Sequence, residues 1–275
     1  MPVIIPPIKC QGIKSKLVDW ITKKTPKKYN VWYEPFMGSG VVGFNIRPKK
    51  AVFGDTNPNL VNFYNDIKNG VISYEKMRQF LVEEGKKLSE FGDDYYKQVR
   101  ARFNIQPNSY DFLFLNRSCF NGMMRFNGKG GFNVPFCKKP NRFSQAYITK
   151  ITNQIKNISA LIQMHDWQFV CDTFENTIKK AKPSDIIYCD PPYIDRYSDY
   201  FNSWTEIDEQ KLFDLLDKGK ARFILSTWHH NKYRQNKYID SLWSKFNVDT
   251  KNHFYHLGAS EDNRNEMVEA LITNF

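Results

Sequence analysis

A strand-like segment that runs directly into a glycine-rich turn restricts the fold of this chain more than any other feature. Residues 31–36 (VWYEPF) lead into residues 38–40 (GSG), and residues 41–44 (VVGF) then read as the start of an apolar helix. Such a turn lets a ligand lie against bare backbone at a helix N-terminus. Residues 51–55 (AVFGD) follow as a second strand that ends in an acid suited to binding hydroxyl groups. This spacing predicts a cofactor pocket on a Rossmann-like sheet.

A second constraint comes from the apolar run 185–189 (DIIYC), which ends in the tetrapeptide Asp190-Pro191-Pro192-Tyr193. The run reads as a buried strand, so it places a carboxylate at the carboxyl end of a strand. Two prolines lack N–H groups and fix φ, which leaves free carbonyls and an aromatic ring beside the acid. Asp190 and the Pro191 carbonyl could accept both hydrogens of an amino group on a planar base that stacks on Tyr193. Alone, the tetrapeptide also fits an ordinary turn, because Asp-Pro is a turn signal.

The chain carries an excess of basic side chains. Forty lysines and arginines stand against 29 aspartates and glutamates, which gives a formal net charge of +11. A polyanion is therefore a plausible partner, and nucleic acid is the leading candidate. The 275 residues can form one large domain or one domain with an insert. Residues 1–7 do not resemble a signal segment and no apolar run approaches about eighteen residues, so we expect a cytoplasmic protein with no membrane partner.

Cysteine and histidine usage argues against disulfides and metal. The chain has five cysteines without any C-x-x-C spacing, which indicates reduced thiols packed as small hydrophobes. His253 and His256 have a spacing that could ligate a metal, but no matching Cys or acid pair accompanies them. We therefore expect structural or surface histidines and no metal site. No Pro-Cys pair occurs either, so a nucleophilic cysteine has no obvious candidate.

Residues 112–165 contain no Asp or Glu. Aromatic side chains are interleaved with the cations of this block, and Asn-Gly and Gly-Gly pairs at 121–122 and 130–131 signal turns. The pattern predicts a basic β-hairpin that carries Arg, aromatic and Met side chains toward DNA. The alternative is a solvated cationic loop whose aromatics lie in the core, and we expect core packing for Phe112 and Phe114. The eight cations are Arg117, Arg125, Lys129, Lys138, Lys139, Arg142, Lys150 and Lys156.

Hydrophobic periodicity indicates a sheet that is split by an insert. After the strand at 51–55 we expect a helical stretch from about 58 to 103, then the hairpin block, and then a helix over 148–164. The remaining expected elements are strands at 167–170, 186–189, 222–226 and 267–275 and a helix over 208–218.

The order of these motifs resembles that of the Dam-type (D12 class) DNA adenine N6-methyltransferases over nearly the whole chain. Residues 9–14 (KCQGIK) are similar to the opening K-W-A-G-G-K of that family, residues 34–40 to its E-P-F-x-G-x-G, and residues 55–57 to its D-x-N. Cys10 stands where Trp is usual, and Ile13 stands where Gly is usual.

Downstream motifs extend this resemblance. Residues 116–127 and 131–136 are similar to the target-recognition hairpin of the family, and residues 172–174 (DTF) are similar to a stretch that contacts the cofactor. Residues 190–193 match its catalytic D-P-P-Y. The resemblance implies an α/β, Rossmann-like, S-adenosylmethionine-dependent methyltransferase sheet with an inserted helical plus β-hairpin target-recognition domain. It divides the chain into a catalytic domain, 1–56 and 145–275, and a target-recognition domain, 57–144.

Site residues follow from the same motifs. The catalytic positions are Asp190, Pro191, Pro192 and Tyr193. On the cofactor side the resemblance places Lys14, Phe36, Gly38, Asp55, Asp172, Phe174 and Asp190, to which the opening motif adds Cys10 and the glycine turn adds Ser39 and Gly40. Toward DNA it places Lys9, Phe120, Asn121, Met123, Arg125 and Pro135, to which the acid-free block adds Arg117, Asn127, Lys129, Lys138 and Lys139.

The reaction implied is methyl transfer from S-adenosylmethionine to N6 of an adenine flipped out of duplex DNA, with a GATC-containing site as the expected target. Double-stranded DNA is the expected partner, a cognate restriction endonuclease is a further candidate, and we expect a monomer. Related chemistry on cytosine N4 or on an RNA amino group stays open, as does a non-catalytic DNA-binding module. Residues 38–43 (GSGVVG) also match G-x-G-x-x-G, so a nicotinamide-dependent oxidoreductase is another alternative.

Overall fold

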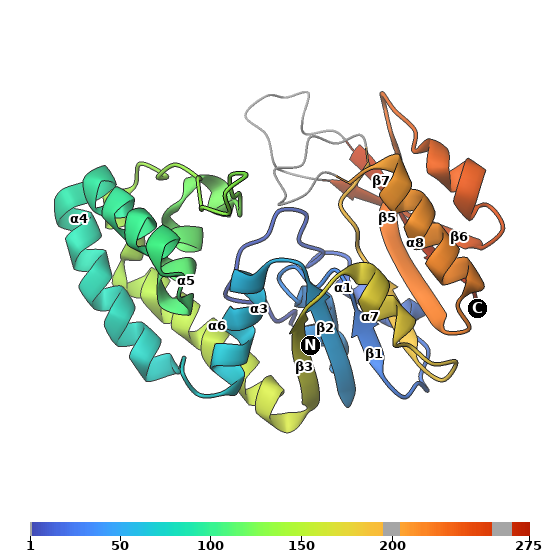
Figure 1. Cartoon of the computed structure of the whole chain (residues 1–275), viewed down its shortest axis with the longest axis horizontal. Coiled ribbons are helices and arrows are strands. Elements are labelled where there is room, and N and C mark those ends of the chain that lie inside the picture. Colours follow the sequence, from blue (N-terminus) through green and yellow to red (C-terminus); the bar gives the residue numbers. More distant parts are fainter. Residues whose placement is uncertain (1, 195–203, 255–265) are drawn as a thin grey trace.

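A mixed seven-stranded sheet forms the centre of the molecule (Figure 1). The structure is a computed structural model that describes residues 2–194, 204–254 and 266–275. Its strands lie in the order β3-β2-β1-β4-β5-β7-β6, in which the first five are mutually parallel and β7 is antiparallel to both of its neighbours. The strands are β1 (Trp32–Glu34), β2 (Lys50–Asp55), β3 (Asp166–Cys171), β4 (Ile186–Cys189), β5 (Arg222–Asn231), β6 (Asn247–Phe254) and β7 (Glu266–Thr273).

Strands in the middle of a parallel sheet are covered on both faces, so they read as continuous apolar runs. Every residue of β1 and of β4 is buried, which agrees with the apolar segments of the sequence. β4 has the predicted bounds, and the predicted strands in β2, β3 and β7 are confirmed to within two residues at each end. β5 continues five residues beyond its predicted end at Ser226, because it goes on pairing with β7 across a register shift between Trp228 and His230.

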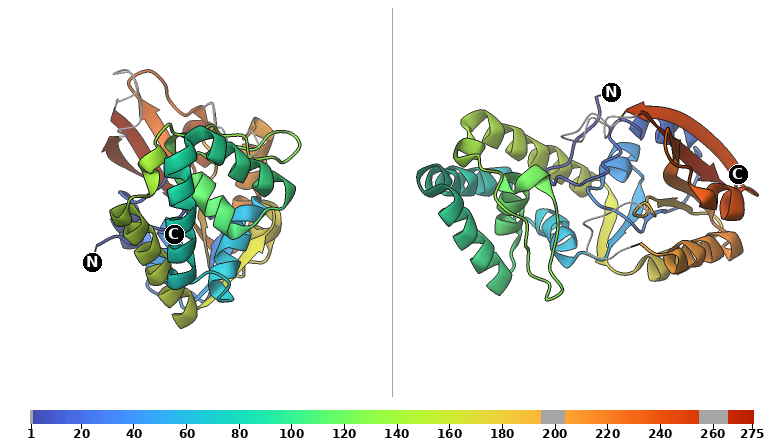
Figure 2. Two further views of the ribbon diagram at one scale, coloured as in Figure 1. Left: turned by 90° about the vertical axis from the view of Figure 1, so that its left-hand side faces the viewer. Right: turned by 90° about the horizontal axis from the view of Figure 1, so that it is seen from above.

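Helices cover both faces of the sheet. In Figure 2 the dark-blue α1 and the yellow-to-orange α7 and α8 lie on opposite sides of the strands. α3 contacts β2 and β3. The helices of this part of the molecule are α1 (Val18–Lys24), α2 (Val41–Ile46), α3 (Pro58–Lys68), α7 (Phe174–Lys179) and α8 (Glu206–Lys218). A short helical turn, η3 (Ile239–Trp243), precedes β6.

A second group of helices packs beyond the β3 edge of the sheet, on the left of Figure 1. It comprises α4 (Tyr74–Ile105), α5 (Ser109–Ser118), η1 (Phe120–Gly122), η2 (Pro140–Phe143) and α6 (Gln145–Met164). The predicted helical stretch 58–103 is two helices, because the chain reverses at Gly70 with a left-handed φ of 72°. Gly92 adds a kink within α4, where φ is 56° and ψ is −125°.

The acid-free block does not form the continuous β-hairpin that its turns predict. Residues 119–136 fold back on themselves with two isolated antiparallel bridges, Cys119 to Phe136 and Phe126 to Phe132. Asn121 and Gly122 both adopt positive φ, which interrupts the extended conformation a ladder needs. We call residues 119–137 the recognition loop. Phe112 and Phe114 lie in the core with no exposed surface, as predicted.

Three of the sequence predictions concern absences. All five cysteines are free thiols. Within the described residues, no helix is both long and apolar enough to cross a membrane, and no group of His, Cys, Asp and Glu could hold a metal ion. His256 lies outside the described residues, and the side chain of His253 is not described.

Candidate active site

The predicted cofactor and catalytic residues meet at one edge of the sheet. Asp55 ends β2, Asp172 follows β3, and Asp190 follows β4, so the three acids lie at carboxyl ends of parallel strands. β1 lies between β2 and β4, and the chain therefore switches from one side of the sheet to the other at this point. Open α/β sheets bind ligands at such a switch point.

The turn after β1 has the backbone shape that its glycines predict. Gly38 and Gly40 adopt left-handed φ values of 51° and 75°, and Gly40 caps α2. A Cβ atom on Gly40 would lie 2.6 Å from the ring of Phe44, so a larger residue would collide there. The Gly38 N–H donates to Asp55 Oδ2 at 3.0 Å, which ties the turn to the end of β2. Ser39 is buried beside them.

Asp55 is held by backbone groups. Its Oδ1 accepts a hydrogen bond from the Asn57 N–H at 2.9 Å, and burial raises its pKa although these N–H groups oppose the shift. Cys10 also lies beside the turn, with its Sγ 4.0 Å from the point that a Cβ on Gly38 would occupy. Burial raises the pKa of the Cys10 thiol, so it is a neutral neighbour of the turn rather than a reactive thiolate.

Asp190 forms an ion pair with Lys14 across the site. Lys14 Nζ lies 2.8 Å from Asp190 Oδ1, and the lysine side chain is only 4% exposed. The same Nζ donates to the Gly12 carbonyl at 3.1 Å and lies 4.9 Å from the centre of the Tyr193 ring. Burial raises the pKa of Asp190, while Lys14 acts in the opposite direction. The opening motif and the D-P-P-Y motif therefore form one charged cluster.

Two buried acids in this region were missed by the sequence analysis. Glu269 on β7 has no exposed surface and accepts a hydrogen bond from Tyr193 Oη at 2.5 Å. Glu34 at the end of β1 accepts from Trp32 Nε1 at 2.9 Å, and burial raises its pKa to about 8. The available signal was an acid inside an otherwise apolar strand, which is rarely buried without a specific partner.

Three aromatic rings pack together beside the turn. Phe36 stacks on Phe174 with ring centroids 5.3 Å apart, and Trp204 meets Phe36 edge-on at 5.5 Å. Asp172 lies next to them at the start of α7. Hydrogen bonds from Lys180, at 2.9 Å, and from Asn176 lower the pKa of Asp172 to about 2, so this acid is ionised at neutral pH.

Lys9 joins the glycine turn region to the recognition loop. The Asn116 side chain clamps its backbone, accepting from the Lys9 N–H at 2.8 Å and donating to the Lys9 carbonyl at 2.9 Å. The Lys9 stem packs over Gly122, where an added Cβ would lie 2.5 Å from Lys9 Cδ. At the same end of the loop Phe120 is 51% exposed, although it is a large apolar side chain.

The other residues predicted to face DNA differ in exposure. Asn121, Asn127, Lys129, Pro135, Lys138 and Lys139 are exposed, whereas Met123 and Arg125 are partly buried. Arg125 Nε donates to Asn133 Oδ1 at 3.0 Å, and its NH2 group donates to the Asn133 carbonyl at 3.3 Å. The guanidinium group thus spans the recognition loop.

Arg117 does not face outward, which corrects its inclusion among the DNA contacts. It is 4% exposed, and its guanidinium group donates to Gln154 Oε1 at 2.6 Å and to Tyr147 Oη at 3.3 Å. Arg142 NH2 donates to the same hydroxyl at 2.9 Å. At the end of α5 the Arg117 side chain points inward, between α5 and α6. A run of basic residues in the sequence does not show which of them point inward. Arg117 therefore supports the inserted region from within.

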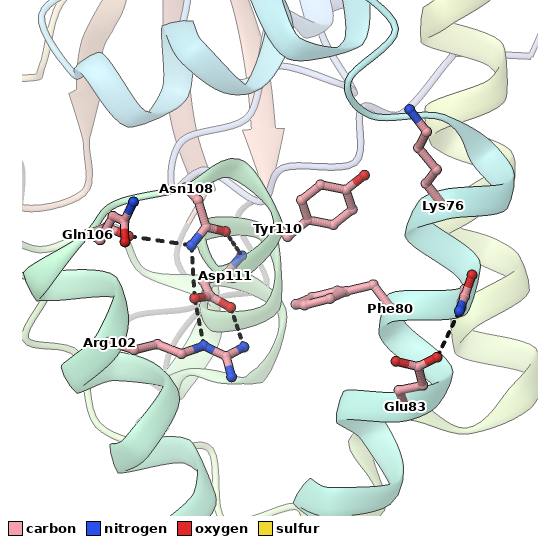
Figure 3. A pocket seen from close by; sticks show the side chains of 9 residues that line it. Lys76, Phe80, Glu83, Arg102, Gln106, Asn108, Tyr110 and Asp111 are labelled. Atoms are coloured by element: carbon pink, nitrogen blue, oxygen red, sulfur yellow. Dashed lines mark hydrogen bonds and ion pairs between the residues drawn. The ribbon is translucent and has the colours of Figure 1, made fainter.

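The insert also contains a hollow of about 490 Å³ between α4 and α5, away from the strand ends (Figure 3). Phe80 and Tyr110 both line it and contact each other, with ring centroids 5.1 Å apart. On one side Arg102 pairs with Asp111, and on the other Gln79 donates to Glu83. These polar groups are satisfied by one another, and the hollow contains none of the predicted site residues.

The sheet order, the glycine turn and the D-P-P-Y strand end together define a Rossmann-like methyltransferase fold. Residues 11–257 match the family of D12 class N6 adenine-specific DNA methyltransferases, and the chain belongs to this family. The predicted fold class and the predicted family are confirmed. The protein is therefore an adenine-specific DNA methyltransferase, which sets aside the oxidoreductase and the non-catalytic DNA-binding module.

Curated relatives cover most of the chain. A DNA adenine methylase of Haemophilus influenzae is 31% identical over 261 residues, which span 88% of this chain and 86% of the relative. A DNA adenine methylase of Vibrio cholerae is 33% identical over 232 residues, 79% and 78% of the two chains. The Type II methyltransferase M.MjaIII of Methanocaldococcus jannaschii is 29% identical over 299 aligned positions, 98% and 99% of the two chains.

Proposed function

We propose that the protein transfers the methyl group of S-adenosylmethionine to N6 of an adenine flipped out of duplex DNA, and that Asp190 is the main catalytic residue. The observation that carries this proposal is the position of Asp190, at the end of β4 beside the glycine turn of β1. The exocyclic nitrogen of adenine is a poor nucleophile because its lone pair is conjugated with the ring. Acceptors for both amino hydrogens, Asp190 and the Pro191 carbonyl, would localise that lone pair for in-line attack.

The residues at the strand ends fit S-adenosylmethionine. Left-handed Gly38 and Gly40 leave bare backbone at the start of α2, and a side chain at position 40 would collide with Phe44. Asp55 offers a carboxyl group for hydroxyls, while the stacked Phe36 and Phe174 offer an apolar wall for a base. Asp172, Ser39 and Cys10 complete the proposed cofactor side. When bound, the cofactor supplies an electrophilic methyl group on its sulfonium centre.

Lys14 has two roles in this proposal. Its ammonium group lies 2.8 Å from Asp190, where it opposes the effect of burial and favours the ionised form of that acid. Ionised Asp190 accepts hydrogen bonds from the amino group of the base. Lys14 also lies near the Tyr193 ring, so it can meet the carboxylate of a cofactor that enters between the two motifs. Pro191 and Pro192 hold the Asp190 and Tyr193 side chains at a fixed separation.

The insert supplies the DNA contacts in this proposal. We assign residues 57–144 to target recognition and residues 1–56 and 145–275 to catalysis. Exposed Phe120 can fill the stack that the flipped adenine leaves, with Asn121, Met123 and Pro135 beside it. Lys129, Lys138 and Lys139 are exposed cations that can neutralise phosphates, with Asn127 next to them in the loop. We propose that Lys9 and Arg125, which the recognition loop and Asn116 hold in place, read base edges in a GATC-containing target.

We also propose that the protein works as a monomer and that a cognate restriction endonuclease recognises the same DNA sequence. Support for the endonuclease comes from a relative over the full chain length that is named a Type II methyltransferase. Light scattering of the pure protein tests the first point. Protection of host DNA against a candidate endonuclease tests the second.

The direct test of the reaction uses purified protein, methyl-labelled S-adenosylmethionine, and matched duplex DNA and RNA. Digestion to nucleosides should recover the label as N6-methyladenine from DNA. Label in N4-methylcytosine, or in RNA but not in DNA, would overturn the proposal.

A further inference from the structure

Glu269 is a buried acid that contacts the catalytic motif from a distant part of the sequence. It lies on β7, opposite Trp228 of β5 and Lys251 of β6, and it has no exposed surface. Tyr193 Oη donates a hydrogen bond to its Oε2 at 2.5 Å. Seventy-six residues separate the two partners, so the sheet brings them together.

Burying a carboxyl group in a strand is expensive unless it is hydrogen-bonded. The three residues that follow Glu269 (Ala270, Leu271 and Ile272) are apolar and buried, as expected for a strand inside a sheet. The acid therefore contributes something other than core packing, and one hydrogen bond that it accepts comes from the tyrosine of the D-P-P-Y motif.

A hydrogen bond to the hydroxyl fixes where the far end of the Tyr193 ring lies. Without such a contact, a tyrosine side chain can swing about its Cα–Cβ bond between staggered rotamers. Glu269 holds the hydroxyl end, while Lys14 Nζ lies 4.9 Å from the ring centre and 2.8 Å from Asp190. The cluster thus links the position of the ring to the carboxylate that receives the amino group of the base.

We propose that Glu269 is a positioning residue for methyl transfer, which holds the hydroxyl of Tyr193 so that its ring stays at a fixed position against the flipped adenine. This inference rests on the proposed function, in which adenine stacks on Tyr193. Fixed alignment matters because in-line attack tolerates little displacement of the nitrogen from the methyl group.

The test compares Glu269→Gln, which keeps an acceptor oxygen, with Glu269→Leu, which removes it. Single-turnover methylation by Glu269→Leu should fall on the order of ten- to a hundredfold, while its Kd values for DNA and S-adenosylmethionine stay close to wild type. Glu269→Gln should keep most of the rate. Equal rates for wild type and Glu269→Leu would overturn the inference, and so would an equal loss of rate and binding in both variants.

A double-mutant cycle separates positioning from general destabilisation. Tyr193→Phe removes the donor, so adding Glu269→Gln or Glu269→Leu to Tyr193→Phe should cause little further loss of rate. If the two changes multiply, Glu269 acts independently of Tyr193 and the inference is wrong. Should Glu269→Leu fail to fold in a thermal melt, Tyr193→Phe alone tests the inference, because it removes the same hydrogen bond. Its single-turnover rate should fall on the order of ten- to a hundredfold, and a wild-type rate would overturn the inference. A wild-type protein that makes no N6-methyladenine would instead refute the proposed function itself.

Discussion

The protonation state of the acid in the site depends on a balance between burial, which favours its neutral form, and ion pairing, which favours its charged form. Asp190 lies in surroundings that raise its pKa, yet the proposed chemistry needs it as an ionised acceptor. Lys14 is the cation that favours this form, and it is nearly as buried as the core. The ion pair of a buried lysine with a partly buried aspartate is costly to break, because either partner left alone is an uncompensated charge.

The pH dependence of turnover should therefore depend on Lys14. In the wild type, the single-turnover rate should rise with pH as Asp190 loses its proton, at a pH above the ordinary range of aspartate. Lys14→Met removes the charge that lowers this pKa, so the acidic limb should move to higher pH. Lys14→Arg keeps the charge and should move the limb far less. Identical profiles in all three proteins, at saturating cofactor, would show that Asp190 does not control the limb.

Arg125 should determine which base pair the protein accepts at one position of its target site. Its planar fork can bond both acceptors on the major-groove edge of guanine, once DNA competes with the Asn133 contacts that hold it in this structure. Arg125→Ala should cost about 1–3 kcal/mol of discrimination at that position. Lys139→Ala, a matched loss of charge at an exposed position, should weaken cognate and non-cognate DNA alike. Methylation rates on every single-base variant of the site provide the measurement, and an unchanged ranking with Arg125→Ala would contradict the assignment.

At the scale of elements, local patterns predicted the parts of the fold that depend on local physics. The buried strands β1 and β4 appear as apolar runs, and the turn at Gly38 and Gly40 appears as glycines where the backbone takes left-handed φ values. Features that depend on which elements become neighbours were not predictable. Arg117 points inward because α5 packs against α6, and Glu269 reaches Tyr193 because β7 inserts next to β5.

The recognition loop offers a matched pair of glycines for testing its structure. Gly122 has φ of 68°, and a Cβ there would lie 2.5 Å from the Lys9 stem, whereas Gly128 has open space around it and no positive φ. Gly122→Ala should lower stability by about 1–2 kcal/mol and weaken DNA binding by displacing Lys9. Gly128→Ala should leave both nearly unchanged. Thermal melts and DNA affinity measure the difference, and similar values for the two variants would mean that the loop tolerates a side chain under Lys9.

For the whole molecule, charge is distributed unevenly, and the acid-free block places many of its cations in the insert. Exposed cations release counterions from DNA on binding, which makes affinity depend on salt.

We expect log Kd to change with log salt with a slope equivalent to about five or six released counterions. The preference for cognate over non-cognate sites should change much less. Replacing exposed Lys138 and Lys139 together by Ala should reduce the slope by about two, whereas Arg117→Gln should leave it unchanged because Arg117 is buried. A slope near zero in the wild type would show that the block binds something other than phosphate.

The central claim is that Asp190, at the end of β4, is where methyl transfer to adenine takes place. Its most direct test is the single-turnover rate of N6-methyladenine formation by Asp190→Ala, with DNA and S-adenosylmethionine affinities measured on the same protein. The account predicts a rate loss on the order of a hundredfold or more with DNA binding retained, because the variant lacks a preorganised acceptor for developing charge. A near wild-type rate in Asp190→Ala would contradict it and place the catalytic centre elsewhere.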